Sequence, residues 1–558
     1  MPPPVFRAFS VLCVLAGVLL PASGAAQAAK QTVCTITVNS ADEKDAFQRH
    51  LPADRYSFVE LVERGRPDWL ESARRKGIRC DVLIISGHYD GGDYAGGNEF
   101  FSEHVEAREF LPVDEMERAA CSEPDRGLFS QVKEVYLFGC NTLNPEALRS
   151  GTELRGSLIE SGHSAPDADR LARALGARYP DSSRDRMRHI FPNVPAIYGF
   201  SSVAPLGPAA ATYLDRYFRA GGTSEISTGR AGTRLLGYFP GRSLTLARGV
   251  RNEDADAGMR RDVCQFVDDR LSSAQKVEWV HRLLGRDIAE VRVFLDRLER
   301  FGASLDEAAR RSPDVAAALD AIARDGDARS RYLRFVHATD RPAVRARLIE
   351  VAASLGWLSP LERREELGQM IVDLLGRSTV TAADVDLVCR LNQERGLNDA
   401  VDRLPGLEEP NIGRAAIRAC LGSPIDDLRV VRALVSDRDG DVQIAQVYLR
   451  QRPLRDTGEV REIALGIARM TDPVAQTRAL DTLAHLRVQD RETLALLTSL
   501  FPNVKSVTVQ RAIAGVLIRA DFEQIATPDL VRDLREHRLK SPDGQDLIDV
   551  LIRRLDIS

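Results

Sequence analysis

The chain has 558 residues, of which 44% are hydrophobic and 28% charged, and its formal net charge is −5. A chain of this length exceeds what one hydrophobic core usually holds, so we expect about two or three domains. The small net charge, with acids and bases interleaved, gives no electrostatic reason to expect nucleic acid or an anionic membrane as a partner.

The first thirty residues have the pattern of a secretory signal. Arg7 precedes an apolar stretch over 11–20, and small residues follow, ending in Ala26-Gln27-Ala28. Because the apolar stretch is too short to span a bilayer, a membrane anchor is the weaker interpretation. The sequence therefore predicts a signal peptide over 1–28 and an exported mature protein, periplasmic or secreted, that makes no use of a membrane.

Strand and helix patterns alternate between residues 31 and 250. We expect strands at 33–38, 56–62, 82–85, 135–138 and 196–200, and helices at 67–76, from 113, at 169–179 and at 209–219. A Gly-rich loop covers 89–98, and polar and apolar residues alternate over 100–110. Strands separated by helices form a parallel sheet that is covered on both faces. The expected fold class of 31–250 is thus α/β, an α/β/α sandwich with a mostly parallel sheet.

Two of these strands end at reactive side chains. The apolar run 82–85 leads to His88, and the run 135–138 leads to Cys140. Open α/β sheets place their ligands and chemistry at the carboxyl ends of their strands. A thiol and an imidazole at one such edge predict a catalytic pair in which the thiolate attacks a carbonyl and the imidazole handles the proton. Such chemistry needs neither a metal nor an organic cofactor.

Backbone groups beside this pair complete the predicted site. The chain leaves the sheet at both strand ends, so the N–H groups of Cys140 and Tyr89 are the expected oxyanion donors. Gly87 and Gly139 would let a substrate backbone approach closely. Asp90 is a candidate pocket residue, although acidic loop residues are more often simply solvated.

These residues resemble those of the caspase-like (clan CD) cysteine peptidase superfamily, and bacterial CHAT domains are the nearest members. The shared features are an apolar strand that ends in His, a second that ends in a small residue and Cys, and a separation near fifty residues, here fifty-two. The resemblance covers about 31–250. It implies that Cys140 is the nucleophile and His88 the proton-transfer residue. Tyr89 is a departure, because the family usually has Gly directly after the His.

The segment from Arg149 to Pro166 is polar and rich in Gly and Ser. We expect an exposed loop that proteases reach. It corresponds to the region where caspase-like enzymes are often processed.

After about residue 260 only helical patterns remain. Short Gln-containing motifs recur at Gln443, Gln476 and Gln510, which are 33 and 34 residues apart. A period in the thirties with two helices per unit is typical of a helical solenoid. Residues 260–558 therefore resemble HEAT-type repeats that bind a protein, and the alternative is an irregular helical bundle.

Removal of the signal leaves seven cysteines, an odd number, so at least one thiol stays free or pairs with another molecule. Cys140 is the one with a chemical reason to stay free. Cys34 and Cys80 each begin an apolar strand pattern and are the leading disulfide candidates. Cys389 and Cys420 lie on apolar helical faces and are expected to be ordinary buried residues. No paired Cys/His spacing predicts a zinc site.

The preferred functional hypothesis is an exported caspase-like cysteine endopeptidase with a helical-repeat region for a protein substrate or partner. One alternative is a non-catalytic recognition module on a helical scaffold. Another is a thioester acyltransferase that uses the same Cys/His pair.

Overall fold

In the computed structural model the described residues are 29–557 apart from 67, 91–97, 103–108, 124–126, 147–164, 166–181, 240, 242, 287, 399–410, 455, 522–524, 526, 542–543 and 545. The predicted signal peptide, the predicted helix at 169–179, most of the Gly-rich loop and all but one residue of the Arg149–Pro166 loop lie outside them. The chain divides into two compact units, 1–149 with 176–270 and 150–175 with 271–558.

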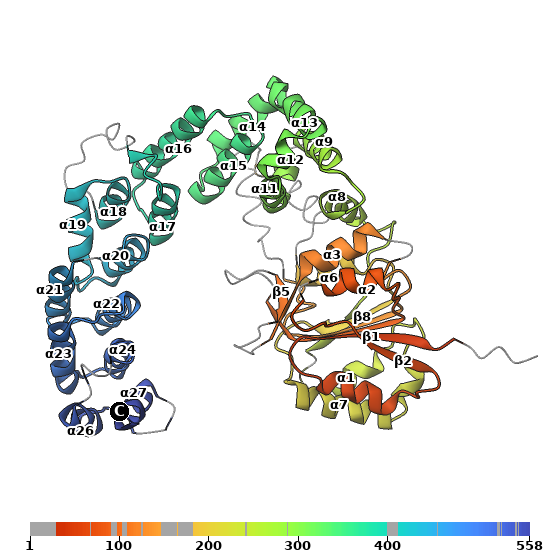
Figure 1. Ribbon diagram of the computed structural model, residues 1–558, viewed down its shortest axis with the longest axis horizontal. Helices are drawn as coiled ribbons and strands as arrows, with labels where there is room; N and C mark the ends of the chain where they lie inside the picture. Colours follow the sequence, from red (N-terminus) through yellow and green to blue (C-terminus); the bar gives the residue numbers. More distant parts are fainter. Residues whose placement is uncertain are drawn as a thin grey trace, which may run out of the picture. The chain divides into compact units, whose positions relative to one another are not determined.

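A six-stranded sheet lies at the centre of the first unit (Figure 1). Its strands are β1 (Gln31–Thr37), β2 (Tyr56–Glu60), β3 (Val82–Ser86), β7 (Glu134–Phe138), β8 (Ala196–Phe200) and β9 (Leu244–Ala247). They are arranged in the order β2-β1-β3-β7-β8-β9. All neighbours pair in parallel except β8 and β9, which are antiparallel. The expected mixed α/β fold with a mostly parallel sheet is confirmed.

Helices cover both faces of this sheet (Figure 1). They are α1 (Asp42–His50), α2 (Trp69–Arg75), α3 (Val113–Ser122), α6 (Ser183–Ile190) and α7 (Gly207–Arg219). The unit also has a helix α8 (Ala257–Val267) and short 3₁₀ turns at Gly222–Glu225 and Arg234–Tyr238. Helices α1 and α7 lie on one face, and α2, α3 and α6 lie on the other.

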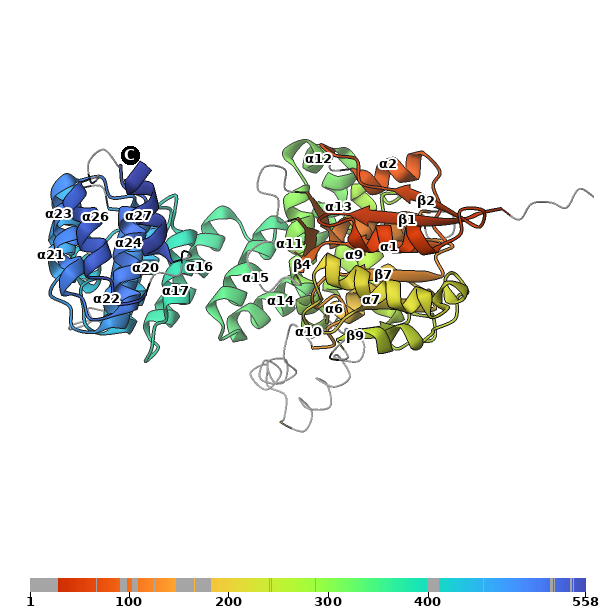
Figure 2. The same ribbon diagram turned by 90° about the horizontal axis from the view of Figure 1, so that it is seen from below.

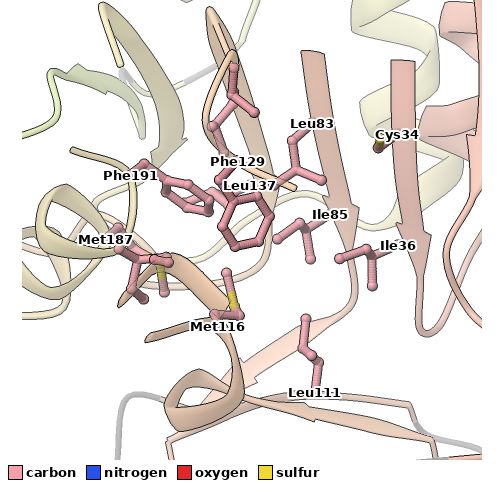
Figure 3. Close-up of a cluster of buried hydrophobic side chains, with 14 of the residues drawn as sticks. Cys34, Ile36, Leu83, Ile85, Leu111, Met116, Phe129, Leu137, Met187 and Phe191 are labelled. Carbon is pink, nitrogen blue, oxygen red and sulfur yellow. The ribbon is translucent and has the colours of Figure 1, made fainter. Parts of the chain in front are cut away.

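The strands are continuously apolar because both of their faces are buried. In β3, Val82 and Ile84 pack in the cluster with α1 and α7. The intervening Leu83 and Ile85 belong to the opposite cluster, which Figure 3 shows with Met116 of α3. Alternate side chains of one strand thus hold both helical layers in place.

The first unit extends to residue 270, beyond the end at 250 that the sequence pattern suggests. Helix α8 packs on α3. A disulfide between Cys121 of α3 and Cys264 of α8, with Cα atoms 5.2 Å apart, joins the two helices. In the sequence, α8 is the first of a long series of helical patterns and is therefore predicted to belong to the helical half. Its packing makes it part of the α/β unit.

A second, three-stranded antiparallel sheet follows β3. Its strands are β4 (His88–Asp90), β5 (Glu99–Phe101) and β6 (Phe110–Pro112). Residue 88 pairs with 101 and residue 90 with 99. The two ends of the segment 100–110, where alternation is expected, therefore lie in β5 and β6 of this small sheet.

The second unit is helical throughout its described residues 271–557. Its helices are α9 (Ser273–Leu284), α10 (Ile288–Val293), α11 (Leu295–Ser304), α12 (Glu307–Arg311), α13 (Pro313–Arg324), α14 (Gly326–Ala338), α15 (Pro342–Ser354), α16 (Pro360–Leu375), α17 (Ala382–Leu391), α18 (Ile412–Cys420), α19 (Pro424–Ala433), α20 (Asp439–Gln451), α21 (Thr457–Ile467), α22 (Pro473–Leu486), α23 (Arg491–Leu500), α24 (Val507–Leu517), α26 (Pro528–Glu536) and α27 (Leu547–Ile557). A 3₁₀ turn, η5 (Phe501–Asn503), follows α23.

Toward the end of this unit, helices that are distant in sequence pack side by side. Helix α22 contacts both α20 and α24, while α21 contacts α23 (Figure 2). Gln476 of α22 and Gln510 of α24 are both buried. The Gln476 amide donates to Ile467 O, at the end of α21, and the Gln510 amide donates to Phe501 O, directly after α23. Gln443, the third member of the sequence motif, is exposed.

Three disulfides are present among the described cysteines. One is the Cys121–Cys264 bond already described. A second joins Cys34 of β1 to Cys80, with Cα atoms 5.5 Å apart. Cys389 and Cys420 also pair, which corrects the expectation that they are ordinary buried residues. They were separated by 31 residues in sequence, and the packing of α17 against α18 brings their Cα atoms within 4.8 Å.

Cys140 is the free thiol among the described cysteines. Three disulfides are compatible with an oxidising compartment outside the cytoplasm. Within the described residues, no helix has both the length and the apolar character that a membrane span requires.

Candidate active site at the sheet edge

His88 and Cys140 follow two strands that are neighbours in the sheet. Strands β3 and β7 pair in parallel, and Ser86 is opposite Phe138 at their ends. Beyond that pair the Gly87 N–H donates to the Phe138 carbonyl oxygen at 3.1 Å, so the two chains stay together for one more residue. His88 and Cys140 come next, at the same edge of one sheet, and both are partly exposed. The sequence placed each residue at a strand end, and the topology makes the two ends adjacent.

The turn that carries Cys140 is held against the end of β8. Asn141 has a left-handed backbone with φ of 57°, which turns the chain sharply after the cysteine. The buried Thr142 hydroxyl donates to Gly139 O at 3.1 Å and accepts from Phe200 N at 3.0 Å. These bonds hold the backbone of the turn that carries Cys140.

A backbone N–H approaches the sulfur directly. The amide of Ala204, in the loop between β8 and α7, donates to the Cys140 Sγ at 3.3 Å. A donor in this position interacts more favourably with a thiolate than with a neutral thiol. This contact could not be found from the sequence, because 64 residues separate the two groups.

The same loop exposes apolar side chains. Val203 is 75% exposed and Leu206 is 72% exposed. Large apolar side chains with this exposure flank the residue whose amide contacts the sulfur. They give the edge of the site an apolar surface suited to a peptide side chain.

His88 is oriented by a residue that the sequence analysis did not select. Asn39, just after β1, places its Nδ2 atom 3.2 Å from the His88 Nε2 atom. On the other side, the imidazole packs against the ring of Phe101 in β5, with ring centroids 5.5 Å apart. The ring is therefore held between two elements, and Nε2 is the nitrogen that faces Asn39.

Tyr89 does not occupy the surface of the site. Its side chain is buried against Phe100, with ring centroids 4.9 Å apart, and its hydroxyl donates to Asn98 Oδ1 at 2.6 Å. The departure from the family's glycine is accommodated inside the core. Asp90 continues β4 by pairing with Glu99.

Glycine at 139 is explained by packing within the protein. A Cβ atom there would lie 2.9 Å from both the Gly87 carbonyl oxygen and the Tyr89 Cβ. At Gly87, a Cβ would lie 3.2 Å from the Val38 Cβ. Both glycines thus allow neighbouring chain segments to approach closely. Packing within the protein is enough to explain them, and no approach of a substrate backbone is needed.

A buried carboxyl group lies beneath the edge. Glu43 of α1 is 4% exposed, and burial raises the pKa of its carboxyl to about 7. A backbone hydrogen bond of Glu43 itself lowers that pKa in part, and Asp42 raises it. Among the described residues Glu43 Oε2 has no hydrogen-bond partner. The neutral carboxyl is consequently the form that suits this site near pH 7 and below.

The described residues contain no group of three His, Cys, Asp or Glu side chains arranged to hold a metal ion. Comparison with known proteins found no matching family model, curated protein or solved structure. Interpretation of the site therefore rests on its residues and their geometry.

Proposed function

We propose that the first unit is a caspase-like, CHAT-like cysteine endopeptidase domain with Cys140 as nucleophile and His88 as proton-transfer residue. The observation that carries this proposal is the pairing of β3 with β7, which brings an imidazole and a free thiol to one sheet edge. The exposed apolar loop beside Cys140 supports a peptide as substrate.

In the proposed reaction the Cys140 thiolate attacks the scissile carbonyl carbon and forms a tetrahedral intermediate. The N–H groups of Cys140 and Tyr89 are assigned to its oxyanion. His88 donates a proton to the leaving amine as the C–N bond breaks, and a thioester remains. Water, losing a proton to His88, then attacks the thioester and releases the acid and the thiolate.

The helical half is proposed to be a HEAT-like region that binds a protein substrate or partner. The two rows of packed helices and the buried glutamines of α22 and α24 support this arrangement. Helix α19 presents Ile425 and Leu428 to solvent, one turn apart, and α21 presents Leu465. Exposed apolar side chains such as these are suited to contact with another protein. An exported location, with the three disulfides, is part of the same proposal.

Labelling with a peptidyl acyloxymethyl ketone tests the peptidase proposal, since this weak electrophile reacts with an activated thiol. We expect one label per chain, at Cys140, and none in Cys140→Ala. Iodoacetamide, which alkylates any accessible thiol, is the control on the same samples. Alkylation of Cys140 by iodoacetamide without any reaction with the ketone would show an exposed but inert thiol and would favour the recognition module.

Asn39 is expected to act as a positioning residue. Asn39→Ala should lower kcat on a pooled fluorogenic peptide library by about 10- to 100-fold, because the imidazole loses the partner that fixes its orientation. KM should change little. Asn39→Asp, whose carboxylate can accept from Nε2 when the imidazole is protonated, should recover most of the rate, whereas a merely structural role would leave both variants equally impaired.

A further inference from the structure

The first unit contains a cavity at the opposite edge of its sheet from His88 and Cys140. A cavity of about 260 Å³ lies among α3, α6 and α8. Its lining includes Phe129 and Ser130, just before β7, and Asn193, just before β8. These residues lie at the amino ends of the strands, whereas His88 and Cys140 lie beyond the carboxyl ends. The cavity is thus separate from the candidate active site.

Positive charge dominates this cavity. Among the described residues, Arg251, Arg260 and Arg261 line it together with one carboxylate, Glu123. Glu123 is already paired with Arg74, whose Nη1 is 2.9 Å from its carboxylate. Arg251 has the Glu253 carboxylate 3.9 Å from its Nη1. Among the described lining residues, the positive charge outside ion pairs is therefore that of Arg260 and Arg261.

Arg260 is the arginine whose contacts bear most directly on anion binding. Its Nε donates to His189 O at 3.0 Å and its Nη2 to Ala120 O at 3.2 Å, which are carbonyls in the last turns of α6 and α3. Burial lowers the pKa of this guanidinium, and no carboxylate opposes the effect. A partly buried cation that bonds only neutral carbonyls is costly, and an anion would relieve that cost.

Nearby carboxylates are engaged elsewhere. Asp256 contacts Arg188 at 2.9 Å and His189 at 3.1 Å. Asp254 contacts Arg248 at 2.7 Å. Neither Asp254 nor Asp256, both of which the structure describes, therefore forms an ion pair with Arg260.

The cavity walls are fixed before any ligand arrives. The Cys121–Cys264 disulfide joins α3 to α8, the helix that carries both Arg260 and Arg261. Arg260 itself bridges the ends of α3 and α6. A site whose charged groups are held in advance loses less entropy when it binds.

We propose that this cavity binds a small dianionic oxyanion of the phosphate class, either free phosphate or a small phosphate monoester. Guanidinium groups match phosphate oxygens with paired, charge-assisted hydrogen bonds. Ser130, Asn193 and Asn252 add polar groups to the lining. The volume is small for a ligand pocket, which favours a small anion over a long polymer. The proposal is independent of whether Cys140 is catalytic.

Isothermal titration calorimetry of the full chain with inorganic phosphate, at an ionic strength kept constant with chloride, tests the site. We expect saturable binding of one phosphate per chain. Arg261→Gln should weaken it roughly tenfold through loss of one charge-assisted hydrogen bond. The matched control is Arg219→Gln, which removes an exposed arginine from α7 in the same unit and should leave the affinity unchanged.

A second arm uses glycerol 3-phosphate. Binding at least as tight as that of inorganic phosphate, with the same loss in Arg261→Gln, identifies a monoester as the better ligand, and weaker binding identifies free phosphate. Absence of saturable binding to both compounds overturns the proposal. Equal weakening by Arg261→Gln and Arg219→Gln does so too, because it would show only non-specific attraction to positive charge.

Discussion

Replacement of His88 by alanine is expected to lower kcat/KM on a pooled fluorogenic peptide library by about 10³- to 10⁴-fold, which is the upper range of a positioned acid–base group. The loss is large because the proposed imidazole serves two steps. It protonates the leaving amine when the thioester forms, and it takes a proton from water when the thioester is hydrolysed. Labelling of Cys140 by the acyloxymethyl ketone should slow in parallel.

The matched control for this variant is His50→Ala. His50 also contacts a polar side chain, Asp215, at 3.0 Å and stacks on an aromatic ring, that of Phe218. It ends α1, far in sequence from the two reactive strand ends. His50→Ala should keep the wild-type rate. A His88→Ala protein with wild-type peptide hydrolysis would remove His88 from the mechanism and leave Cys140 without its proposed partner.

The reactive strand ends were predictable because a buried parallel strand leaves a strong local signal. The runs over 82–85 and 135–138 are apolar on both faces, and both strands form. The same local signal does not predict that the two strands are neighbours. Their adjacency depends on β3 pairing with β7, and sequence reasoning reached it only through resemblance to a known pattern.

The contacts that support the two side chains could not be predicted. Asn39 reaches His88 across 49 residues, through the pairing of β1 with β3. Ala204 contacts Cys140 through its backbone amide. Because nearly every residue type has a backbone N–H, the amino-acid type at position 204 does not indicate this contact. Each contact is tertiary, so no local pattern marks it.

Helix α1 was missed because its sequence is mostly polar. Only Glu43, Ala46 and Phe47 are buried in its nine residues. One of the three is an acid, so the apolar stripe that usually reveals an amphipathic helix is nearly absent. The residue that obscured the helix is also a buried acid whose pKa is raised by its burial.

Glu43 is expected to make the first unit less stable as the pH rises. Its carboxyl pKa is about 7 in the folded protein, against an ordinary value of 4.5. Below pH 4.5 both states bind the proton. Between 4.5 and 7 only the folded state does, so the free energy of unfolding falls with rising pH and levels off above 7. The shift corresponds to about 3 kcal/mol.

Glu43→Gln removes this ionisation while it keeps the side-chain shape. The parent should lose about 3 kcal/mol of unfolding free energy between pH 4.5 and pH 8 through this ionisation, and Glu43→Gln should not. Relative to the parent, the variant is therefore about 3 kcal/mol more stable at pH 8 than at pH 4.5. Urea unfolding in a Trp279→Phe, Trp357→Phe background measures it, because Trp69, buried in the first unit, is then the reporter.

Asp45→Asn is the control, since Asp45 is an exposed acid on the same helix. Its pH-dependent difference should stay within about 0.5 kcal/mol, as for other surface substitutions. If Glu43→Gln showed the same small difference as Asp45→Asn, the folded protein would have to hold Glu43 as a charged carboxylate at little cost. The space between α1 and the end of β3 would then have to supply that carboxylate with hydrogen-bond donors, or admit water to it.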